Sequence, residues 1–277
     1  MPRTPTCVLS DSAPPSVTDG HALDRYVPLA SVTKVLTATA LTRMTAAGLL
    51  TPDDPVERWL PSAAPGTGIT LHHLAAHTSG LPRLPPGRLP RRDPYARFDR
   101  PALDRLLPRL DTLAVRPPGE EEYSNLGYAV LGAALTEAAG TTYDALVTRH
   151  VLDPLDLTEI TSAPPPDQRL LAPGLLGRPR RPWTMDGAIL PAGGLWATPR
   201  ATADLIVRLL VERRLGDPAP AWQQAGPLHW HNGATRHASL FTGALNDGRW
   251  LVLHRLNAQP EQTDRMGIGL LRDTTPD

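Results

Sequence analysis

The sequence has little of the side chains that usually supply thiol and ammonium groups. Among its 277 residues there is one cysteine, Cys7, and one lysine, Lys34, and the other 27 basic residues are arginine. A single cysteine excludes a disulfide within the chain, and we expect Cys7 to be a small buried hydrophobic residue. The lone lysine is informative, because arginine keeps its proton in a protein whereas a desolvated lysine can lose it.

Net charge and long hydrophobic runs are also absent. The 28 basic and 28 acidic residues balance, which argues against nucleic acid or an anionic membrane as a partner. No apolar run approaches the roughly 20 residues of a membrane-spanning helix. Residues 1–9 lack the apolar core of about 7–15 residues that marks a secretory signal. We therefore expect a cytoplasmic protein with no membrane partner.

Proline and glycine, by contrast, are plentiful. The 32 prolines and 22 glycines mark many turns, and two proline-rich segments, 83–101 and 162–183, predict long surface connections. Apolar periodicity and capping signals predict the regular elements. The predicted strands are 5–10, about 25–29, 230–241 and 249–256, with a turn at 246–248, and the main predicted helices are 31–47, 70–77, 125–139, 143–152, 199–214 and 261–272.

This order of elements predicts an α+β fold. The short first strands and the last strands share one antiparallel sheet flanked by helices only if the helical middle is an insertion. We expect a single domain over 1–277, with a sheet subdomain of about 1–50 plus 184–277 and a mostly helical subdomain of about 51–183. A cleft between two such parts is a common place for a site.

Ser31 and Lys34 form a Ser-x-x-Lys element at the start of a predicted helix. Residues i and i+3 share a helix face, so the hydroxyl and the ammonium can meet. A serine hydroxyl is a weak nucleophile that needs a neighbouring base, and a helix N-terminus favours negative charge developing on its oxygen. A solvated surface lysine is the alternative, which we disfavour because arginine serves such positions elsewhere in this chain.

Two further elements could face the same cleft. Tyr123-Ser124-Asn125 precedes a predicted helix, and a nearby ammonium would lower the tyrosine pKa from its ordinary value of about 10. His231-Asn232-Gly233 begins a predicted strand, where glycine lets a substrate approach the backbone. Taken singly, the first element also fits a tyrosine that only packs against its neighbours, and the second fits an ordinary strand edge. Because histidine titrates in the physiological range, we expect His231 to give the activity an inflection between about pH 5.5 and 7.5.

Together and in this order, the three elements resemble the signature of the serine β-lactamase and penicillin-binding-protein superfamily, which reads Ser-x-x-Lys, Tyr-x-Asn and Lys/His-x-Gly. The branch with class C β-lactamases, DD-peptidases and family VIII esterases is the most similar. The resemblance runs from about residue 24 to 257. Its flanking segments are Leu49–Val56, Ala76–Pro82, Asn125–Tyr128, Asp153–Leu155 and Ala192–Thr198.

The resemblance implies a β-lactamase/transpeptidase-like fold and a serine acyl-enzyme. Ser31 would attack a carbonyl, and Lys34 and Tyr123 would share the role of base. The backbone N–H groups of Ser31 and Ala234 would form the oxyanion hole. The implied substrate-binding residues are Asn125, His231, Asn232, Gly233 and Ala234. No cofactor and no metal are expected.

The third element departs from the Lys-Thr-Gly form of the family pattern. His-Asn-Gly in place of Lys-Thr-Gly lacks the lysine and the threonine hydroxyl that would recognise the carboxylate of a β-lactam or a peptide. With few residues before Ser31 and no export signal, this favours an intracellular esterase, amidase or transacylase, as found in natural-product biosynthesis. The substrate would be a small-molecule ester or amide, and an amine or alcohol could accept the acyl group. A β-lactamase or DD-peptidase is the alternative.

Two other functional classes were weighed. A zinc site could use His72, His73 and His77, but no glutamate follows His73 in a His-Glu-x-x-His pattern and no third ligand has an obvious spacing. A catalytically inactive binding or sensor protein of the same fold is the second class. It is disfavoured because the Ser-x-x-Lys and Tyr-x-Asn elements are both complete.

Overall fold

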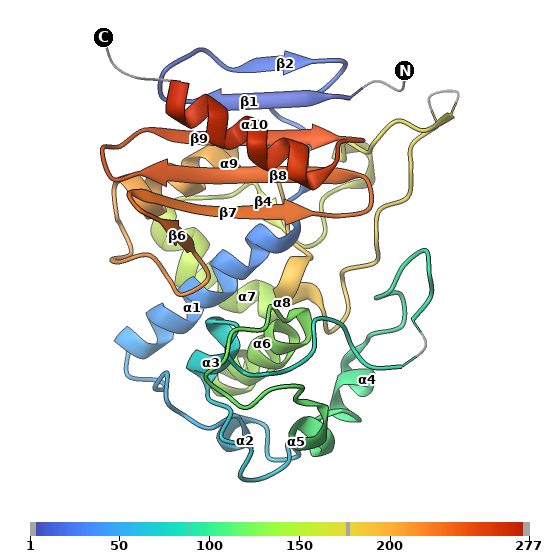
Figure 1. Ribbon diagram of the computed structural model, residues 1–277, viewed down its shortest axis with the longest axis vertical. Coiled ribbons are helices and arrows are strands. Elements are labelled where there is room, and N and C mark those ends of the chain that lie inside the picture. Colours follow the sequence, from blue (N-terminus) through green and yellow to red (C-terminus); the bar gives the residue numbers. More distant parts are fainter. Residues whose placement is uncertain (1–3, 88, 176–177, 274–277) are drawn as a thin grey trace.

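A six-stranded antiparallel sheet dominates one half of the molecule (Figure 1). The computed structural model describes residues 4–87, 89–175 and 178–273. The strand order is β2-β1-β9-β8-β7-β6, and β1 pairs with β9, so both ends of the chain build one sheet. The strands are β1 (Thr6–Ser10), β2 (Ser16–Thr18), β6 (Gln223–Ala225), β7 (Leu228–Ala234), β8 (Ala238–Leu245) and β9 (Trp250–Leu256).

The two faces of this sheet are covered by different helices. Helix α10 (Pro260–Asp273) packs on the face that carries Phe241, and α9 (Pro199–Ile206) packs on the face that carries Leu240. Successive side chains of a strand point to opposite faces, so these two neighbours in β8 serve different cores. In Figure 1, α10 lies in front of the sheet and α9 behind it. Cys7 of β1 is fully buried, as predicted, and burial raises the pKa of its thiol to about 12.

The predicted strand 230–241 is wrong, because the chain turns within it. Strand β7 ends at Ala234 and β8 begins at Ala238, and the Thr235 N–H donates to the carbonyl of Ala238 across the turn. The turn residues Thr235, Arg236 and His237 include neither glycine nor proline, so no strong turn signal was present. The predicted turn at 246–248 is confirmed between β8 and β9, where Gly248 has a positive φ of 95°.

The other half of the molecule is mostly helical and is built around α6 (Asn125–Ala139). Ser124 caps its N-terminus by accepting the Gly127 N–H, and Gly140 ends it in a left-handed conformation, so the predicted helix 125–139 is confirmed. The surrounding helices are α2 (Val56–Trp59), α3 (Leu71–Ala75), α4 (Arg100–Asp104), α5 (Leu110–Leu113), α7 (Tyr143–Val147) and α8 (Leu190–Gly193). Helices α7 and α9 each continue as a π-helical turn, η3 (Thr148–Leu152) and η7 (Val207–Val211).

A small three-stranded sheet and α1 join the two halves. The small sheet has the order β3 (Val27–Pro28), β5 (Trp196–Ala197) and β4 (Ile160–Thr161). Directly after β3, a 3-10 turn, η1 (Ala30–Val32), leads into α1 (Thr33–Ala46), so the predicted helix 31–47 begins with a tighter turn than expected. Within the described residues, no helix is both long enough and apolar enough to cross a membrane.

Candidate active site

Ser31 lies in η1, where the chain passes from the small sheet into α1. Ala30 before it has φ of +48°, a left-handed conformation that costs a non-glycine residue energy. The turn is held from both sides, because the Leu29 N–H donates to the carbonyl of Leu195 and the Val32 N–H donates to the carbonyl of Leu29. The surrounding fold therefore fixes the backbone at Ser31.

The three predicted catalytic side chains meet at one oxygen. Lys34 Nζ donates to Ser31 Oγ over 3.2 Å, and Tyr123 Oη donates to the same Oγ over 2.8 Å. Lys34 Nζ also donates to the carbonyl of Ala192 in α8 over 2.6 Å. Lys34 has no exposed surface, and Tyr123 reaches Ser31 from the segment before α6. The serine hydroxyl is thus flanked by two groups that can exchange protons with it.

The environment lowers the pKa values of both partners below their ordinary values. Burial lowers the pKa of Lys34 and outweighs the opposing effect of the neighbouring Tyr123. For Tyr123, burial alone would raise the pKa, but the charge of Lys34, the hydrogen bonds from Lys34 and to Ser31, and Arg83 lower it overall. A lysine that loses its proton more easily and a tyrosine that ionises more easily form a proton-sharing pair beside the hydroxyl.

His77 holds the tyrosine in place, a role that the sequence analysis missed. The Glu122 N–H donates to the His77 carbonyl over 2.7 Å, and the Ser124 N–H donates to His77 Nδ1 over 3.1 Å. The imidazole ring also lies 4.3 Å, centroid to centroid, from the Tyr123 ring. One histidine therefore binds the backbone on both sides of Tyr123. Its position in the Ala76–Pro82 segment was the available signal.

Electrostatics keep His77 neutral. Burial, followed by the charges of Lys34 and His231, lowers its pKa to about 3. Because Nδ1 accepts a hydrogen bond, the neutral ring carries its proton on Nε2, which is buried with no hydrogen-bond partner among the described residues. A neutral ring at this position adds no further positive charge next to Lys34.

Asn125 lies at the edge of the site with its two amide atoms in different situations. Its Nδ2 donates to Tyr95 Oη over 2.8 Å, and its Oδ1 is buried without a partner among the described residues. Tyr95 comes from the 83–101 connection and packs edge-on against Trp183 of the second proline-rich connection. The two long connections thus meet beside the predicted substrate-binding amide.

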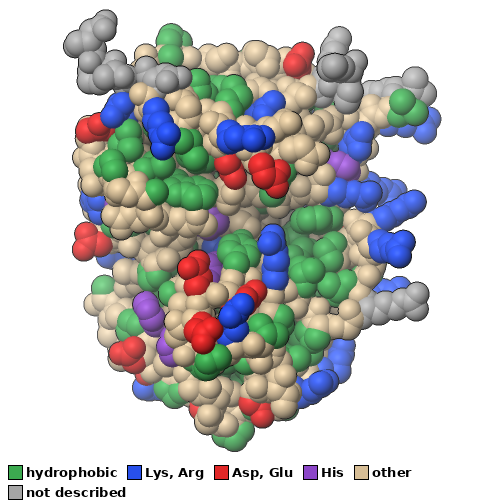
Figure 2. All heavy atoms as spheres, in the orientation of Figure 1, with side chains coloured by type: hydrophobic (Ala, Val, Ile, Leu, Met, Phe, Trp, Pro, Cys, Tyr) green, Lys and Arg blue, Asp and Glu red, His purple; other side chains and the backbone are tan. Residues whose placement is uncertain are grey.

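Strand β7 forms the opposite wall. A side chain at Gly233 would place a Cβ 2.5 Å from the Leu29 carbonyl oxygen and 3.4 Å from the Ser31 nitrogen, so only glycine lets the strand run this close. Ala234 is the last residue of β7 and follows this contact directly. In Figure 2, histidine side chains are visible between the sheet half and the helical half of the molecule.

His231 faces the site, and Asn232 does not. His231 is 2% exposed, and burial, then the charge of Lys34, lowers its pKa to about 4. The expected inflection between about pH 5.5 and 7.5 is therefore wrong, because a buried imidazole beside an ammonium protonates only at lower pH. Asn232 donates from Nδ2 to Asp264 of α10 over 2.7 Å, on the other face of the sheet. The structure does not bring the Asn232 amide toward Ser31.

The three histidines that the sequence suggested as zinc ligands have separate roles. His73 completes a capping box with Thr70 at the start of α3, His72 is exposed, and His77 holds the tyrosine segment. Among the described residues, no group of three or more His, Cys, Asp or Glu is placed to hold a metal ion.

Arg83 lies at the tyrosine with an unpaired charge. Its guanidinium carbon is 5.3 Å from the centroid of the Tyr123 ring. The residue is exposed and takes part in no ion pair among the described residues. Its carbonyl accepts the Asn125 N–H over 3.0 Å, so its backbone is tied to the Tyr-Ser-Asn segment.

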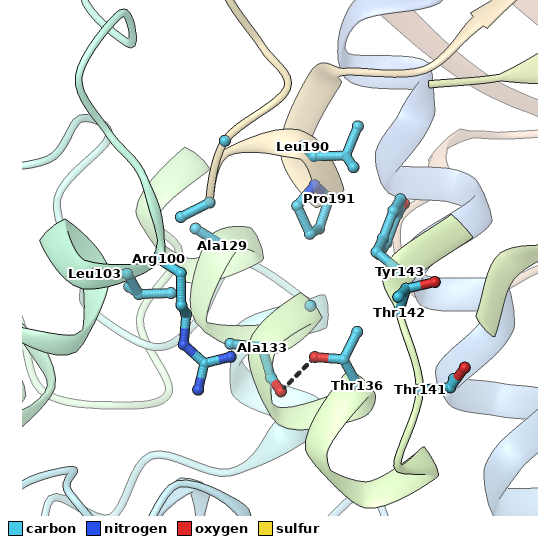
Figure 3. Close-up of a pocket in the computed structure, with 13 residues that line it drawn as sticks. Arg100, Leu103, Ala129, Ala133, Thr136, Thr141, Thr142, Tyr143, Leu190 and Pro191 are labelled. Atoms are coloured by element: carbon cyan, nitrogen blue, oxygen red, sulfur yellow. Dashed lines mark hydrogen bonds between the residues drawn. The ribbon is translucent and has the colours of Figure 1, made fainter. Parts of the chain in front are cut away.

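A separate cavity of about 270 Å³ lies behind α8 (Figure 3). Pro191 and Leu190 of α8, Tyr143 of α7 and Ala133 of α6 contribute to its lining. None of the three predicted catalytic residues lines it. Helix α8 lies between the cavity and the catalytic residues. Pro191 lines the cavity, and the carbonyl of the next residue, Ala192, accepts a hydrogen bond from Lys34 Nζ.

Comparison with known proteins places this geometry in a family. A family model described as Beta-lactamase matches residues 16–266. The D-alanyl-D-alanine-carboxypeptidase/endopeptidase AmpH of Escherichia coli (strain K12) is 33% identical over 186 residues, which are 64% of this chain and 47% of that protein. Esterase EstB of Burkholderia gladioli is 33% identical over 187 residues, 61% of this chain and 46% of that protein. The chain thus spans about half the length of these relatives.

A solved structure extends the likeness over nearly the whole chain. The beta-lactamase/D-alanine carboxypeptidase from Yersinia pestis superposes with a TM-score of 0.79 at 20% identity, covering 98% of this chain and 93% of that one. This confirms the predicted α+β, β-lactamase/transpeptidase-like fold.

Proposed function

Since the chain belongs to the β-lactamase family, we propose that it is a serine hydrolase or acyltransferase that forms an acyl-enzyme at Ser31. The observation that carries the proposal is the shared contact at Ser31 Oγ, which accepts hydrogen bonds from both Lys34 Nζ and Tyr123 Oη. A structural serine has no need of two largely buried proton-exchanging partners whose pKa values are both lowered.

The reaction follows from these contacts. Ser31 Oγ attacks the carbonyl carbon of an ester or amide, and its proton passes to the Lys34–Tyr123 pair. The backbone N–H groups of Ser31 and Ala234 stabilise the oxyanion, supported by the close approach of β7 to the Ser31 nitrogen. The bond to the leaving group then breaks, and the pair returns the proton to the leaving oxygen or nitrogen. Water, an amine or an alcohol attacks the acyl-enzyme and releases Ser31.

The opposite wall of the site lacks the groups with which the Lys-Thr-Gly form of the signature would hold a β-lactam carboxylate. His231 stands at the position that is lysine in the Lys-Thr-Gly form of the signature, and it is buried and neutral at pH 7. Asn232 stands where the signature has threonine, and its amide is bonded to Asp264 on the far face of the sheet. Neither side chain offers a charged or hydroxyl group for a substrate carboxylate. An esterase, amidase or transacylase is consistent with this wall, and a role in natural-product biosynthesis in the cytoplasm is part of the proposal.

The main alternative is a β-lactamase or DD-peptidase, and the names of AmpH and of the Yersinia pestis protein favour it. The name of EstB favours an esterase. An inactive binding or sensor protein is the third candidate, and the proton-sharing arrangement at Ser31 argues against it.

A substrate panel separates these candidates. Purified protein is assayed with 4-nitrophenyl esters, anilides, penicillins and cephalosporins, each in parallel with Ser31→Ala. We expect ester turnover that is lost in Ser31→Ala, and poor turnover of penicillins. Penicillin hydrolysis near the ~10⁵ M⁻¹s⁻¹ of good enzymes would favour the β-lactamase alternative. Adding an amine or alcohol and measuring the new amide or ester distinguishes transfer from hydrolysis.

A further inference from the structure

We propose that Arg83 recognises an anionic group, such as a carboxylate, on the substrate. This inference rests on the proposed function and names the substrate class: esters or amides that carry a negative charge close to the reacting carbonyl. It starts from the position of the guanidinium over the Tyr123 ring, 5.3 Å from its centroid, at the exposed side of the site.

The position of Arg83 is set by the site itself. Its carbonyl accepts the Asn125 N–H over 3.0 Å, and the carbonyl of Pro82 accepts from Ser124 Oγ over 2.8 Å. Two successive residues, Pro82 and Arg83 at the start of the connection, are thereby attached to the segment that carries Tyr123. The guanidinium lies over the ring in a cation–π contact, and a contact of this kind occupies the guanidinium face and not its N–H donors.

Three carboxylates of the surrounding segments are engaged elsewhere. Asp93 accepts the Tyr95 and Thr184 N–H groups, Glu122 pairs with Arg116, and Asp264 accepts from Asn232. Arg83 has no acidic partner among the described residues. An exposed cation without an internal counter-ion, fixed beside the reacting groups, attracts an anionic ligand.

The other basic groups described at the site are not placed to bind a substrate anion. Lys34 is fully buried and directed at Ser31 Oγ and the Ala192 carbonyl. His231 is neutral at pH 7 because burial lowers its pKa to about 4. Arg83 is thus the cation of the site that solvent and substrate can reach, and a planar guanidinium matches a carboxylate with two parallel hydrogen bonds.

The test uses two matched pairs of aryl esters. The first pair places the charge on the acyl half: the 4-nitrophenyl monoester of glutaric acid against 4-nitrophenyl hexanoate. The second places it on the leaving group: 3-carboxy-4-nitrophenyl acetate against 4-nitrophenyl acetate. The measured quantity is the ratio of kcat/KM for the anionic ester to that for the neutral one. A ratio is insensitive to the fraction of enzyme that is folded.

We expect Arg83→Gln to lower this ratio on the order of 5- to 10-fold in at least one pair, and the pair affected identifies the half that carries the charge. Arg83→Lys should retain part of the preference, and the wild-type ratio should fall with added salt. The control is Arg91→Gln, which removes an equal charge from an exposed position of the same connection and should leave both ratios unchanged.

The inference is overturned if both ratios stay within twofold of wild type in Arg83→Gln, or if Arg91→Gln lowers them equally. If the anionic and neutral esters are both turned over through Ser31 and the ratios do not change in Arg83→Gln, the proposed function stands without this inference. Failure of every ester to acylate wild-type Ser31 would instead remove the proposed function, and this inference with it.

Discussion

Acidification should destabilise the protein through His231, a group that is neutral in the fold and charged when the chain unfolds. His231 is 2% exposed, and burial together with the charge of Lys34 lowers its pKa from 6.5 to about 4. Between these two values the unfolded chain binds a proton that the folded chain does not. Stability therefore rises with pH in this window, is fully present above the unfolded pKa, and is lost as pH falls toward the folded one.

The size of the effect follows from the two pKa values. At about pH 5 the unfolded histidine is almost fully protonated and the folded one almost fully neutral, which lowers the free energy of unfolding by about 2 kcal/mol relative to about pH 7.5. Carboxylates also titrate over this range, so the total loss is not assigned to one residue. A variant that is neutral at every pH isolates the contribution of His231.

The assay is urea unfolding at both pH values for wild type, His231→Gln and His72→Gln. His72 is exposed in α3 and serves as the matched control. The loss of unfolding free energy on acidification should be about 2 kcal/mol smaller in His231→Gln than in wild type, and His72→Gln should behave as wild type. A constant destabilisation by glutamine does not affect this difference. If wild type and His231→Gln lose equal stability, His231 is not held neutral in the fold and the reasoning fails.

Three further predictions concern the groups around Ser31. Lys34→Arg keeps the charge but removes any accessible neutral form, so kcat should fall at least ~10²-fold in steady-state ester hydrolysis; near-normal kcat would show that Lys34 supplies charge alone. Tyr123→Phe deletes the hydroxyl that donates to Ser31 Oγ and should also lower kcat by ~10²-fold or more, an expectation that fails if the pH profile and kcat match wild type. His77→Gln removes the imidazole that accepts the Ser124 N–H and packs against the Tyr123 ring, so kcat should drop by roughly 10-fold while KM changes little. A loss of unfolding stability with unchanged kcat would mark a purely structural histidine.

Contacts between residues close in the sequence were predictable from helix geometry, whereas contacts between distant residues were not. The Ser31–Lys34 contact follows from helical spacing, because residues three apart share a face. Tyr123 is 92 residues from Ser31, and only the resemblance to a family could place it there. The helix of 125–139 was predictable because Ser124 and Gly140 supply capping signals at its two ends.

The errors have equally specific causes. Strand alternation alone implies that Asn232 points away from the face that carries His231 and Gly233, yet it was grouped with them because the motif was treated as a unit. The division between β7 and β8 was missed because its turn has no glycine or proline. His77 was weighed as a zinc ligand, since its hydrogen bonds to the tyrosine segment depend on a left-handed backbone, with φ of +59°, that the sequence does not reveal.

The central claim is that Ser31 becomes acylated, and intact-mass spectrometry after brief exposure to 4-nitrophenyl acetate tests it most directly. We predict a gain of one acetyl group per chain in wild type, located on Ser31 by peptide mapping, and no such gain in Ser31→Ala. Acetylation confined to another residue, or equal labelling of wild type and Ser31→Ala, would contradict the account.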